Sequence, residues 1–180
     1  QIDPSQATLC VLFLDIKQFK DINHAYGYHI GDSLLSKVAQ RLKDILENVE
    51  NGFRIGGDHF VVLTKVPNRE EGFTFAERIQ DALLVPFEIA RNEIALKLSF
   101  GLTFCGRNEL EPEKILSRAA LANNIANNRE TKEKVVYDET LHEHYLRRKA
   151  IQQLIPQAIA SNEFRLEYQP VINIQTGRLY

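Results

Sequence analysis

The chain has 180 residues, 44% of them hydrophobic, and a formal net charge of −2. This length and composition predict one domain with its own core and an additional segment. The weakly acidic balance excludes a general nucleic-acid or membrane-surface binder, because such proteins carry a basic patch or tail. No apolar run approaches the ~18 residues that a membrane span needs, and no signal peptide opens the chain. We therefore expect this segment to be cytoplasmic, with any membrane anchor of the whole protein lying upstream.

The first half of the chain predicts a strand, a helix and a hairpin. Residues 8–14 form a short apolar, β-branched and aromatic run, which is typical of a buried strand. Apolar residues recur with a helical period over residues 32–49 and indicate a helix with one buried face. Residues 53–55 and 60–66 predict two strands, joined by a tight turn at Gly56, Gly57 and Asp58.

The second half continues the mixture of hairpins and helices. Residues 75–83 predict a helix, and residues 87–89 and 94–104 predict a hairpin that turns at Arg91 and Asn92. Pro112 opens a further helical pattern over residues 115–126, and residues 135–137 predict a closing strand. We therefore expect an α+β fold, in which a central, mainly antiparallel sheet is flanked by helices.

The composition changes near residue 140. Residues 142–160 are charged and helical in period, and Pro156 is expected to kink or restart the helix. Residues 164–174 alternate as a strand does, and residues 175–177 predict a turn. The predicted organisation is a domain at 1–139, a connecting helix at 140–163 and the start of another domain at 164–180. Cys10 and Cys105 lie in apolar runs without metal-ligand spacing, so we expect free buried thiols.

Polar residues occur at a fixed spacing around the predicted strands. Asp15 ends the first strand, Asn23 follows eight positions later, and Asp32 follows Asn23 by nine. Asp58 and His59 then complete the Gly-Gly-Asp-His-Phe run at the hairpin tip. Taken one at a time, Asp15 could be a strand-end residue that caps the next helix, and Asp32 could be an ordinary helix N-cap. The Gly-Gly-Asp run could be an ordinary tight turn. Their joint order and spacing favour a common site.

The segments FLDIKQFKDINHAYGYHIGD and RIGGDHF resemble the two halves of the GGDEF family pattern. The resemblance covers residues from about Thr8 to Asp138. Active members of the family are diguanylate cyclases, which condense two GTP molecules into cyclic di-GMP. The resemblance therefore implies a fold like that of the nucleotidyl cyclases and the polymerase palm.

The resemblance also implies a role for each residue of the pattern. Phosphoryl transfer uses divalent ions to neutralise the triphosphate, and Mg²⁺ or Mn²⁺ takes carboxylate oxygens as ligands. Asp15 and Asp58 are the expected metal ligands, and Asp58 and His59 occupy the catalytic positions. The residues expected to bind the substrate are Asn23 and Asp32 at the guanine, Phe19 and Lys20 at the phosphates, Gly56 and Gly57 where the backbone nears the nucleotide, and Lys132 in place of a phosphate-binding arginine.

The sequence departs from the family pattern at three places. His59 stands where the pattern has a glutamate metal ligand, and a neutral imidazole is a poor ligand for Mg²⁺. Asn128 is taken as the position of a triphosphate-binding lysine in the Tyr-x-Ala-Lys run. Glu47 and Glu50 occupy the inhibitory Arg-x-x-Asp site, where an acidic residue would repel the product's phosphates. These changes predict weak catalysis without product feedback.

The last residues of the chain resemble the first strands of an EAL domain. Phe164 to Val171 and Thr176 to Leu179 carry this resemblance. EAL domains are cyclic di-GMP phosphodiesterases or, when degenerate, receptors. The chain ends at Tyr180, before the position where the Glu-Ala-Leu motif is expected. The whole protein is therefore expected to be a tandem GGDEF-EAL protein.

Three functions remain open from the sequence. The first is a degenerate GGDEF domain that binds GTP and regulates the downstream EAL domain. The second is an active but impaired diguanylate cyclase, and the third is a spacer or dimerisation domain that binds no nucleotide. The expected partners are GTP, the EAL domain of the same chain and a second copy of the protein. No nucleic acid or membrane contact is expected for this segment.

Overall fold

The computed structural model describes residues 8–46, 51–106, 111–128 and 134–178. The chain divides into two compact units, residues 1–142 and residues 143–180. Among the described residues, no helix is long and apolar enough to cross a membrane.

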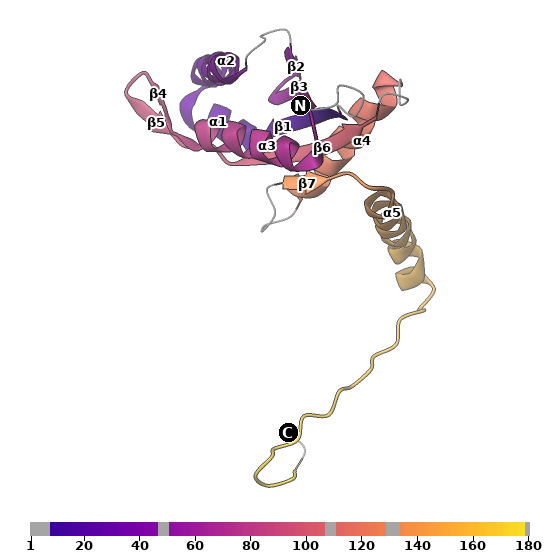
Figure 1. The fold of residues 1–180 in the computed structure, drawn as a ribbon. Helices are drawn as coiled ribbons and strands as arrows, with labels where there is room; N and C mark the ends of the chain where they lie inside the picture. Colours follow the sequence, from indigo (N-terminus) through magenta and orange to yellow (C-terminus); the bar gives the residue numbers. More distant parts are fainter. Residues whose placement is uncertain (1–7, 47–50, 107–110, 129–133, 179–180) are drawn as a thin grey trace. The chain divides into compact units, whose positions relative to one another are not determined.

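A five-stranded sheet forms the centre of the first unit (Figure 1). The strand order is β2-β3-β1-β6-β7, and every neighbouring pair is antiparallel except β6 with β7. The strands are β1 (Thr8–Ile16), β2 (Gly52–Gly56), β3 (His59–Val66), β6 (Leu98–Cys105) and β7 (Lys134–Val136). The expected α+β fold with a mainly antiparallel central sheet is confirmed.

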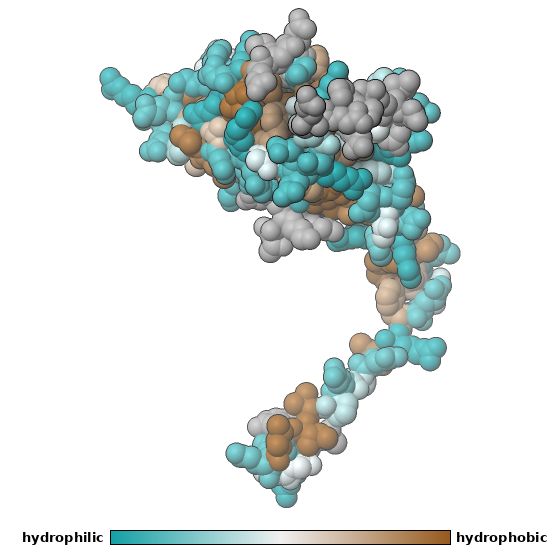
Figure 2. Space-filling view, in the orientation of Figure 1, coloured by the Kyte–Doolittle hydropathy of each residue, from teal (hydrophilic) through white to brown (hydrophobic). Residues whose placement is uncertain are grey.

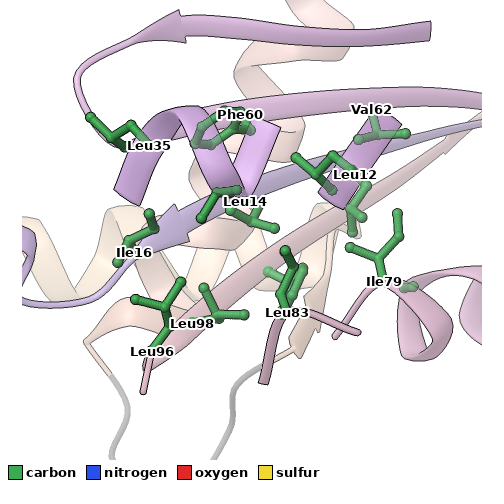
Figure 3. Close-up of a cluster of buried hydrophobic side chains, with 14 of the residues drawn as sticks. Leu12, Leu14, Ile16, Leu35, Phe60, Val62, Ile79, Leu83, Leu96 and Leu98 are labelled. Carbon is green, nitrogen blue, oxygen red and sulfur yellow. The ribbon is translucent and has the colours of Figure 1, made fainter. Parts of the chain in front are cut away.

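The largest hydrophobic cluster lies between the sheet and two helices, α2 (Tyr28–Ile45) and α3 (Arg69–Leu84). Figure 3 shows Leu12 and Leu14 of β1 meeting Phe60 of β3, with Ile79 of α3 in the same cluster. These four side chains are almost fully excluded from solvent. Truncating a buried leucine or isoleucine to alanine costs about 2–5 kcal/mol, so this cluster fixes the sheet on which the site is built.

A smaller cluster covers the opposite face of the sheet. Helix α4 (Pro112–Asn127) packs there through Ile115 and Ala119 against Val11 of β1 and Val61 of β3. Strand β1 is therefore covered on both faces, which explains its almost continuous apolar sequence. Pro112 occupies the first turn of α4, as expected, because a proline there loses no helical hydrogen bond.

The start of the helical region differs from the prediction. A short helix that was not predicted, α1 (Phe19–Tyr26), follows β1, and α2 then begins at Tyr28 rather than at residue 32. Gly27 separates the two helices with a φ of 88°, a conformation that glycine adopts without strain. Helix α2 ends at Ile45, because Leu46 is extended.

The predicted strand over residues 94–104 is also wrong in its extent. Strands β4 (Phe87–Ile89) and β5 (Asn92–Ile94) form a separate two-stranded sheet, and β6 begins only at Leu98. The turn between β4 and β5 uses positive φ angles at Ala90 and Arg91. Strand β6 begins at Leu98 because this residue lies opposite Ile16, the last residue of β1. The residues before Leu98 therefore have no β1 residue to pair with.

Helix α5 (Glu139–Ala160) follows β7 and runs without interruption through Pro156, so the helix is not restarted there. The backbone N–H of Leu141 donates to the Asp138 carboxylate at 2.6 Å and so caps the first turn. A turn forms near the predicted residues 175–177, where the backbone N–H groups of Gln175 and Thr176 donate to the side-chain oxygen of Asn173.

The expected strand over residues 164–174 is not formed. Leu166 and Tyr168 are 84% and 87% exposed, and no strand pairs with this segment in the described part of the chain. An extended segment without a partner lacks the ladder of hydrogen bonds that defines a strand. Figure 2 shows apolar residues at the surface of this segment. Val171 and Ile174 are among its exposed apolar side chains.

Cys10 and Cys105 are both buried, as expected, and they do not form a disulfide with each other. Burial raises the pKa of the Cys10 thiol to about 12, and the neighbouring Cys105 acts in the same direction. The Cys10 thiol therefore stays protonated near neutral pH, which disfavours metal binding by this residue.

Candidate functional site

The first part of the site lies where β1 ends and β3 begins. Asp15 is directly opposite His59 in the antiparallel ladder, so their side chains share one face of the sheet. The His59 Nε2 atom lies 3.8 Å from Asp15 Oδ1 and 3.9 Å from Asp58 Oδ1. One ligand atom from each of these three residues lies within 4.8 Å of the others. The structure thus unites three predicted site residues in one cluster.

The turn between β2 and β3 positions Asp58. Gly57 has a φ of 56°, in the left-handed region, and Gly56 lies opposite His59 in the ladder. A side chain built on either glycine would meet nothing within 4 Å, so the backbone angle rather than crowding requires glycine at 57. Arg54 Nε donates to the Gly57 carbonyl at 2.9 Å and further fixes the turn.

Asn127 of α4 supplies a contact to this cluster that was not predicted. Its side-chain amide donates to Asp15 Oδ2 at 2.7 Å. Asn128, the position assigned to the triphosphate-binding lysine, instead donates to the carbonyl of Asn124 on its own helix at 2.7 Å. The assignment to Asn128 is therefore corrected to Asn127. Counting the Tyr-x-Ala-Lys run from Ala126 places its lysine at 127, which is the signal that could have found this residue.

Asp15 is the most buried member of the cluster, with 7% of its surface exposed. Its pKa is raised to about 6 from an ordinary value of 3.8. Desolvation by burial is the main cause, followed by the negative charge of Asp58, whereas His59 and Lys17 act in the opposite direction. A cation placed between Asp15 and Asp58 would remove this repulsion, so the cluster is suited to hold a divalent ion.

Asp15 does not cap the helix that follows it, which was the structural alternative for this residue. The N-cap of α1 is Gln18, and no side chain caps that end of the helix. Lys17 points toward α4 and donates from its Nζ to the Ala126 carbonyl at 3.3 Å. The carboxylate of Asp15 therefore serves the cluster and its contact with Asn127.

The second part of the site lies at the junction of α1 and α2. Gly31 of α2 packs against Asn23, because a Cβ at this glycine would come within 1.8 Å of Asn23 Oδ1. The same Cβ would lie 3.2 Å from the Phe19 ring. Asn23 Oδ1 is buried and has no hydrogen-bond partner among the described residues. Phe19, Asn23 and Gly31 thus form one contact group.

Asp32 presents an exposed side chain on α2, one residue after the buried Gly31. It is the fifth residue of α2 and therefore not its N-cap, which rules out the structural alternative for this residue. Lys20 is exposed in the first turn of α1. The predicted site residues therefore fall into two groups, one at the ends of β1 and β3 and one at the junction of α1 and α2.

Some predicted residues lie outside the described part of the chain. Lys132 falls between residues 129 and 133, and Glu47 and Glu50 fall between residues 47 and 50. Their expected roles remain predictions.

A profile of the family described as diguanylate cyclase, GGDEF domain, matches residues 1–133. This match covers more than half of the chain, and the chain belongs to the GGDEF family. Solved structures show the same fold. The GGDEF domain of YfiN (TpbB) from Pseudomonas aeruginosa has a TM-score of 0.70 at 25% identity and covers 78% of this chain and 83% of its own. An EAL/GGDEF domain protein from M. capsulatus has a TM-score of 0.65 at 26% identity, with coverages of 77% and 90%.

The chain is similar to the bifunctional diguanylate cyclase/cyclic di-GMP phosphodiesterase MucR of Pseudomonas aeruginosa. The two are 26% identical over 167 residues, which is 93% of this chain and 24% of MucR. The cyclic di-GMP phosphodiesterase NbdA of the same organism is 24% identical over 96% of this chain and 22% of its own length. The chain thus spans about a quarter or less of these two relatives.

Proposed function

We propose that this GGDEF domain binds GTP and regulates an EAL domain of the same protein, and that it makes little or no cyclic di-GMP. The observation that carries the proposal is the contrast between the two parts of the site. The sequence keeps Asn23 and Asp32, the expected guanine ligands, whereas His59 stands where the family pattern has a metal-binding glutamate and Asn127 where it has a lysine. A receptor needs the first part, and a catalyst needs both.

The α1–α2 junction supports guanine recognition. Guanine offers a ring N–H and an amino group side by side, and the exposed carboxylate of Asp32 can accept from both. The buried side-chain oxygen of Asn23 has no hydrogen-bond partner within the described part of the chain, an arrangement that costs about 1–3 kcal/mol in an ordinary protein interior. Because Gly31 has no side chain, it leaves room for the side chain of Asn23. Adenine lacks the paired donors, so we expect discrimination against ATP.

The carboxylate cluster supports weakened catalysis. Joining two nucleotides requires a metal ion that activates the attacking hydroxyl and neutralises the triphosphate. Asp15 and Asp58 remain as oxygen ligands, but the third donor, His59, is a neutral or cationic ring rather than an anion. Asn127 carries no charge to hold the triphosphate. Both losses reduce stabilisation of the developing phosphate charge.

Helix α5 offers a route for coupling to a following domain. It is a single helix of 22 residues, and its first turn is tied to the sheet unit. The Tyr137 hydroxyl donates to Glu139 at 3.1 Å, and Arg118 of α4 lies 3.0 Å from the same carboxylate group. A helix anchored in this way can transmit a shift of α4 to the chain that follows. The EAL resemblance of residues 164–180 and the two-activity name of MucR support a downstream EAL partner.

Regulation is tested in a longer protein that contains the complete EAL domain. Cyclic di-GMP binding and hydrolysis would be measured with and without GTP, and then again in Asp32→Ala. Coupling of about 1–3 kcal/mol corresponds to a change of roughly 5- to 150-fold in affinity. We expect a change in this range that disappears in Asp32→Ala. GTP binding that alters neither quantity would leave the domain as a spacer.

An impaired cyclase is the second candidate, and the retained Asp15 and Asp58 carboxylates favour it. This function requires two GTP-bound copies to meet, so it also requires the predicted homodimer. Chromatographic detection of cyclic di-GMP after long incubation with GTP and Mg²⁺ or Mn²⁺ separates the two candidates. Turnover at ordinary rates would favour the cyclase.

A further inference from the structure

The three side chains that meet at the ends of β1 and β3 combine two oxygen donors with one nitrogen donor. Mg²⁺, the ion expected from the family, prefers an all-oxygen octahedral shell, and this donor set does not match that preference. We propose that Asp15, Asp58 and His59 bind a divalent transition-metal ion, and that the site takes Zn²⁺ in preference to Mg²⁺. The inference does not rest on GTP binding, because all three ligands belong to the protein.

The distances in the cluster are close to those of a loaded site. Zinc lies about 2.0–2.2 Å from nitrogen and carboxylate ligands, so two ligands of one tetrahedral ion are about 3.3–3.6 Å apart. His59 Nε2 comes within a few tenths of an ångström of this separation, at 3.8 Å from Asp15 Oδ1 and 3.9 Å from Asp58 Oδ1. All three ligand atoms lie within 4.8 Å of one another, so a small side-chain rotation completes the geometry.

Neighbouring side chains orient Asp15 and His59 toward each other. Asn127 engages the Oδ2 atom of Asp15 and leaves Oδ1 facing His59. The His59 ring packs on Phe13 with ring centroids 5.4 Å apart, which limits its rotation. The His59 side chain is 47% exposed, so an ion can reach Nε2 from solvent. Such outer contacts orient metal ligands and are typical of metal sites.

The chemistry of the donors sets the preference. Imidazole suits Zn²⁺, Fe²⁺ and Ni²⁺, whereas carboxylates alone suit Mg²⁺ and Mn²⁺. Three protein ligands with a further position open to water or an external oxygen are the usual arrangement of an accessible zinc site. Within the described ranges, no other group of three histidine, cysteine or acidic side chains is close enough to compete.

The test is a metal titration of the nucleotide-free chain after chelator treatment, near neutral pH. Competition with a chromophoric chelator would give the affinities for Zn²⁺, Mn²⁺ and Mg²⁺. We expect one equivalent of Zn²⁺ to bind at least ~100-fold more tightly than Mg²⁺, because imidazole contributes to zinc affinity and not to magnesium affinity. In a nuclear magnetic resonance spectrum, Zn²⁺ should shift the ring signals of His59, identified by their loss in His59→Gln.

His59→Gln should lower Zn²⁺ affinity by about tenfold or more and leave Mg²⁺ binding nearly unchanged, since it removes the nitrogen ligand alone. His59→Glu should narrow the preference for Zn²⁺ over Mg²⁺, because it gives the site three carboxylate ligands. The paired variant His142→Ala/His144→Ala is the matched control and should bind Zn²⁺ as the parent chain does. Equal affinities for Zn²⁺ and Mg²⁺, or zinc binding that survives His59→Gln unchanged, would overturn the proposal. If the chain binds GTP but not Zn²⁺ at this cluster, only the zinc inference is refuted. If it binds Zn²⁺ there but not GTP, only the proposed GTP binding is refuted.

Discussion

The side-chain amide of Asn127 donates a hydrogen bond of 2.7 Å to the carboxylate of Asp15, although the two residues are 112 positions apart. This contact joins the last turn of α4 to the end of β1. It also identifies the helix position that faces the cluster of Asp15, Asp58 and His59. A basic side chain at this position would approach both the carboxylates and any phosphate bound beside them.

The Asn127 contact yields a prediction about catalysis. Combining His59→Glu with Asn127→Lys should restore measurable synthesis of cyclic di-GMP, because it returns an acidic metal ligand and a cation for the triphosphate. His59→Glu alone should recover less. The measurement is chromatographic product analysis after incubation with GTP and Mg²⁺.

The neighbouring residue provides the control for this prediction. Asn128 turns back to the Asn124 carbonyl at 2.7 Å, so a lysine at 128 would not face the cluster. His59→Glu with Asn128→Lys should therefore behave as His59→Glu alone. Equal recovery from lysine at 127 and at 128 would show that α4 does not present Asn127 to the substrate.

The raised pKa of Asp15 predicts an unusual pH dependence of stability without metal. The folded chain holds the Asp15 proton up to about pH 6, whereas the unfolded chain releases it near the ordinary pKa of 3.8. The folded state thus binds more protons between these values, and stability contributed by this group falls as the pH rises through them. By pH 7 the loss is of the order of 1–3 kcal/mol.

Asp15→Asn removes this titrating group and nearly preserves its shape. In chelator, the variant should unfold at higher denaturant than the parent chain at pH 7, and the difference should shrink toward pH 4. Denaturation curves of both proteins at several pH values measure it. A difference that stays constant with pH would contradict the assigned pKa.

The buried thiol of Cys10 should be unreactive in the folded protein. Its pKa of about 12 keeps it protonated at pH 8, and its side chain is fully buried. A thiol reagent should therefore react with Cys10 only after denaturant is added. Rapid labelling of Cys10 in native buffer, located by mass spectrometry, would disagree with the structure.

The contact between Tyr137 and Glu139 should hold the start of α5. Tyr137→Phe removes the hydroxyl that contacts Glu139 at 3.1 Å and His142 Nδ1 at 3.3 Å, and it keeps the ring beneath Arg118. Hydrogen exchange of the amides at residues 139–142 should become faster, by a few-fold, since one exposed hydrogen bond contributes about 0.5–1.5 kcal/mol. Tyr145→Phe, in the same helix, is the control and should leave this exchange unchanged.

Much of the fold could be predicted because β1 and β3 have strong apolar patterns, and the turn between β2 and β3 is marked by two glycines. The cluster of Asp15, Asp58 and His59 follows from that arrangement, since the turn brings residue 58 beside the end of β1. The family pattern supplied the order of these residues. The contact between Asp15 and His59 is set by the register of β1 with β3, which places the two residues opposite each other.

Other features depend on tertiary structure and were not predicted. Helix α1 has eight residues and no side-chain cap, so its sequence carries little start signal. The break before β6 is set by pairing with β1 rather than by local sequence. On a helix, successive residues point about 100° apart, so the shift from Asn128 to Asn127 decides which side chain meets Asp15.

The most direct test of the proposed function is calorimetry of this chain with GTP and with ATP, each in the presence of Mg²⁺. We expect GTP to bind and ATP to bind more weakly. Asp32→Asn should weaken GTP binding by about 1–3 kcal/mol, because it removes the charged acceptor of guanine's two donors. Equal binding of both nucleotides, or no binding of either, would contradict the account of this domain as a GTP receptor.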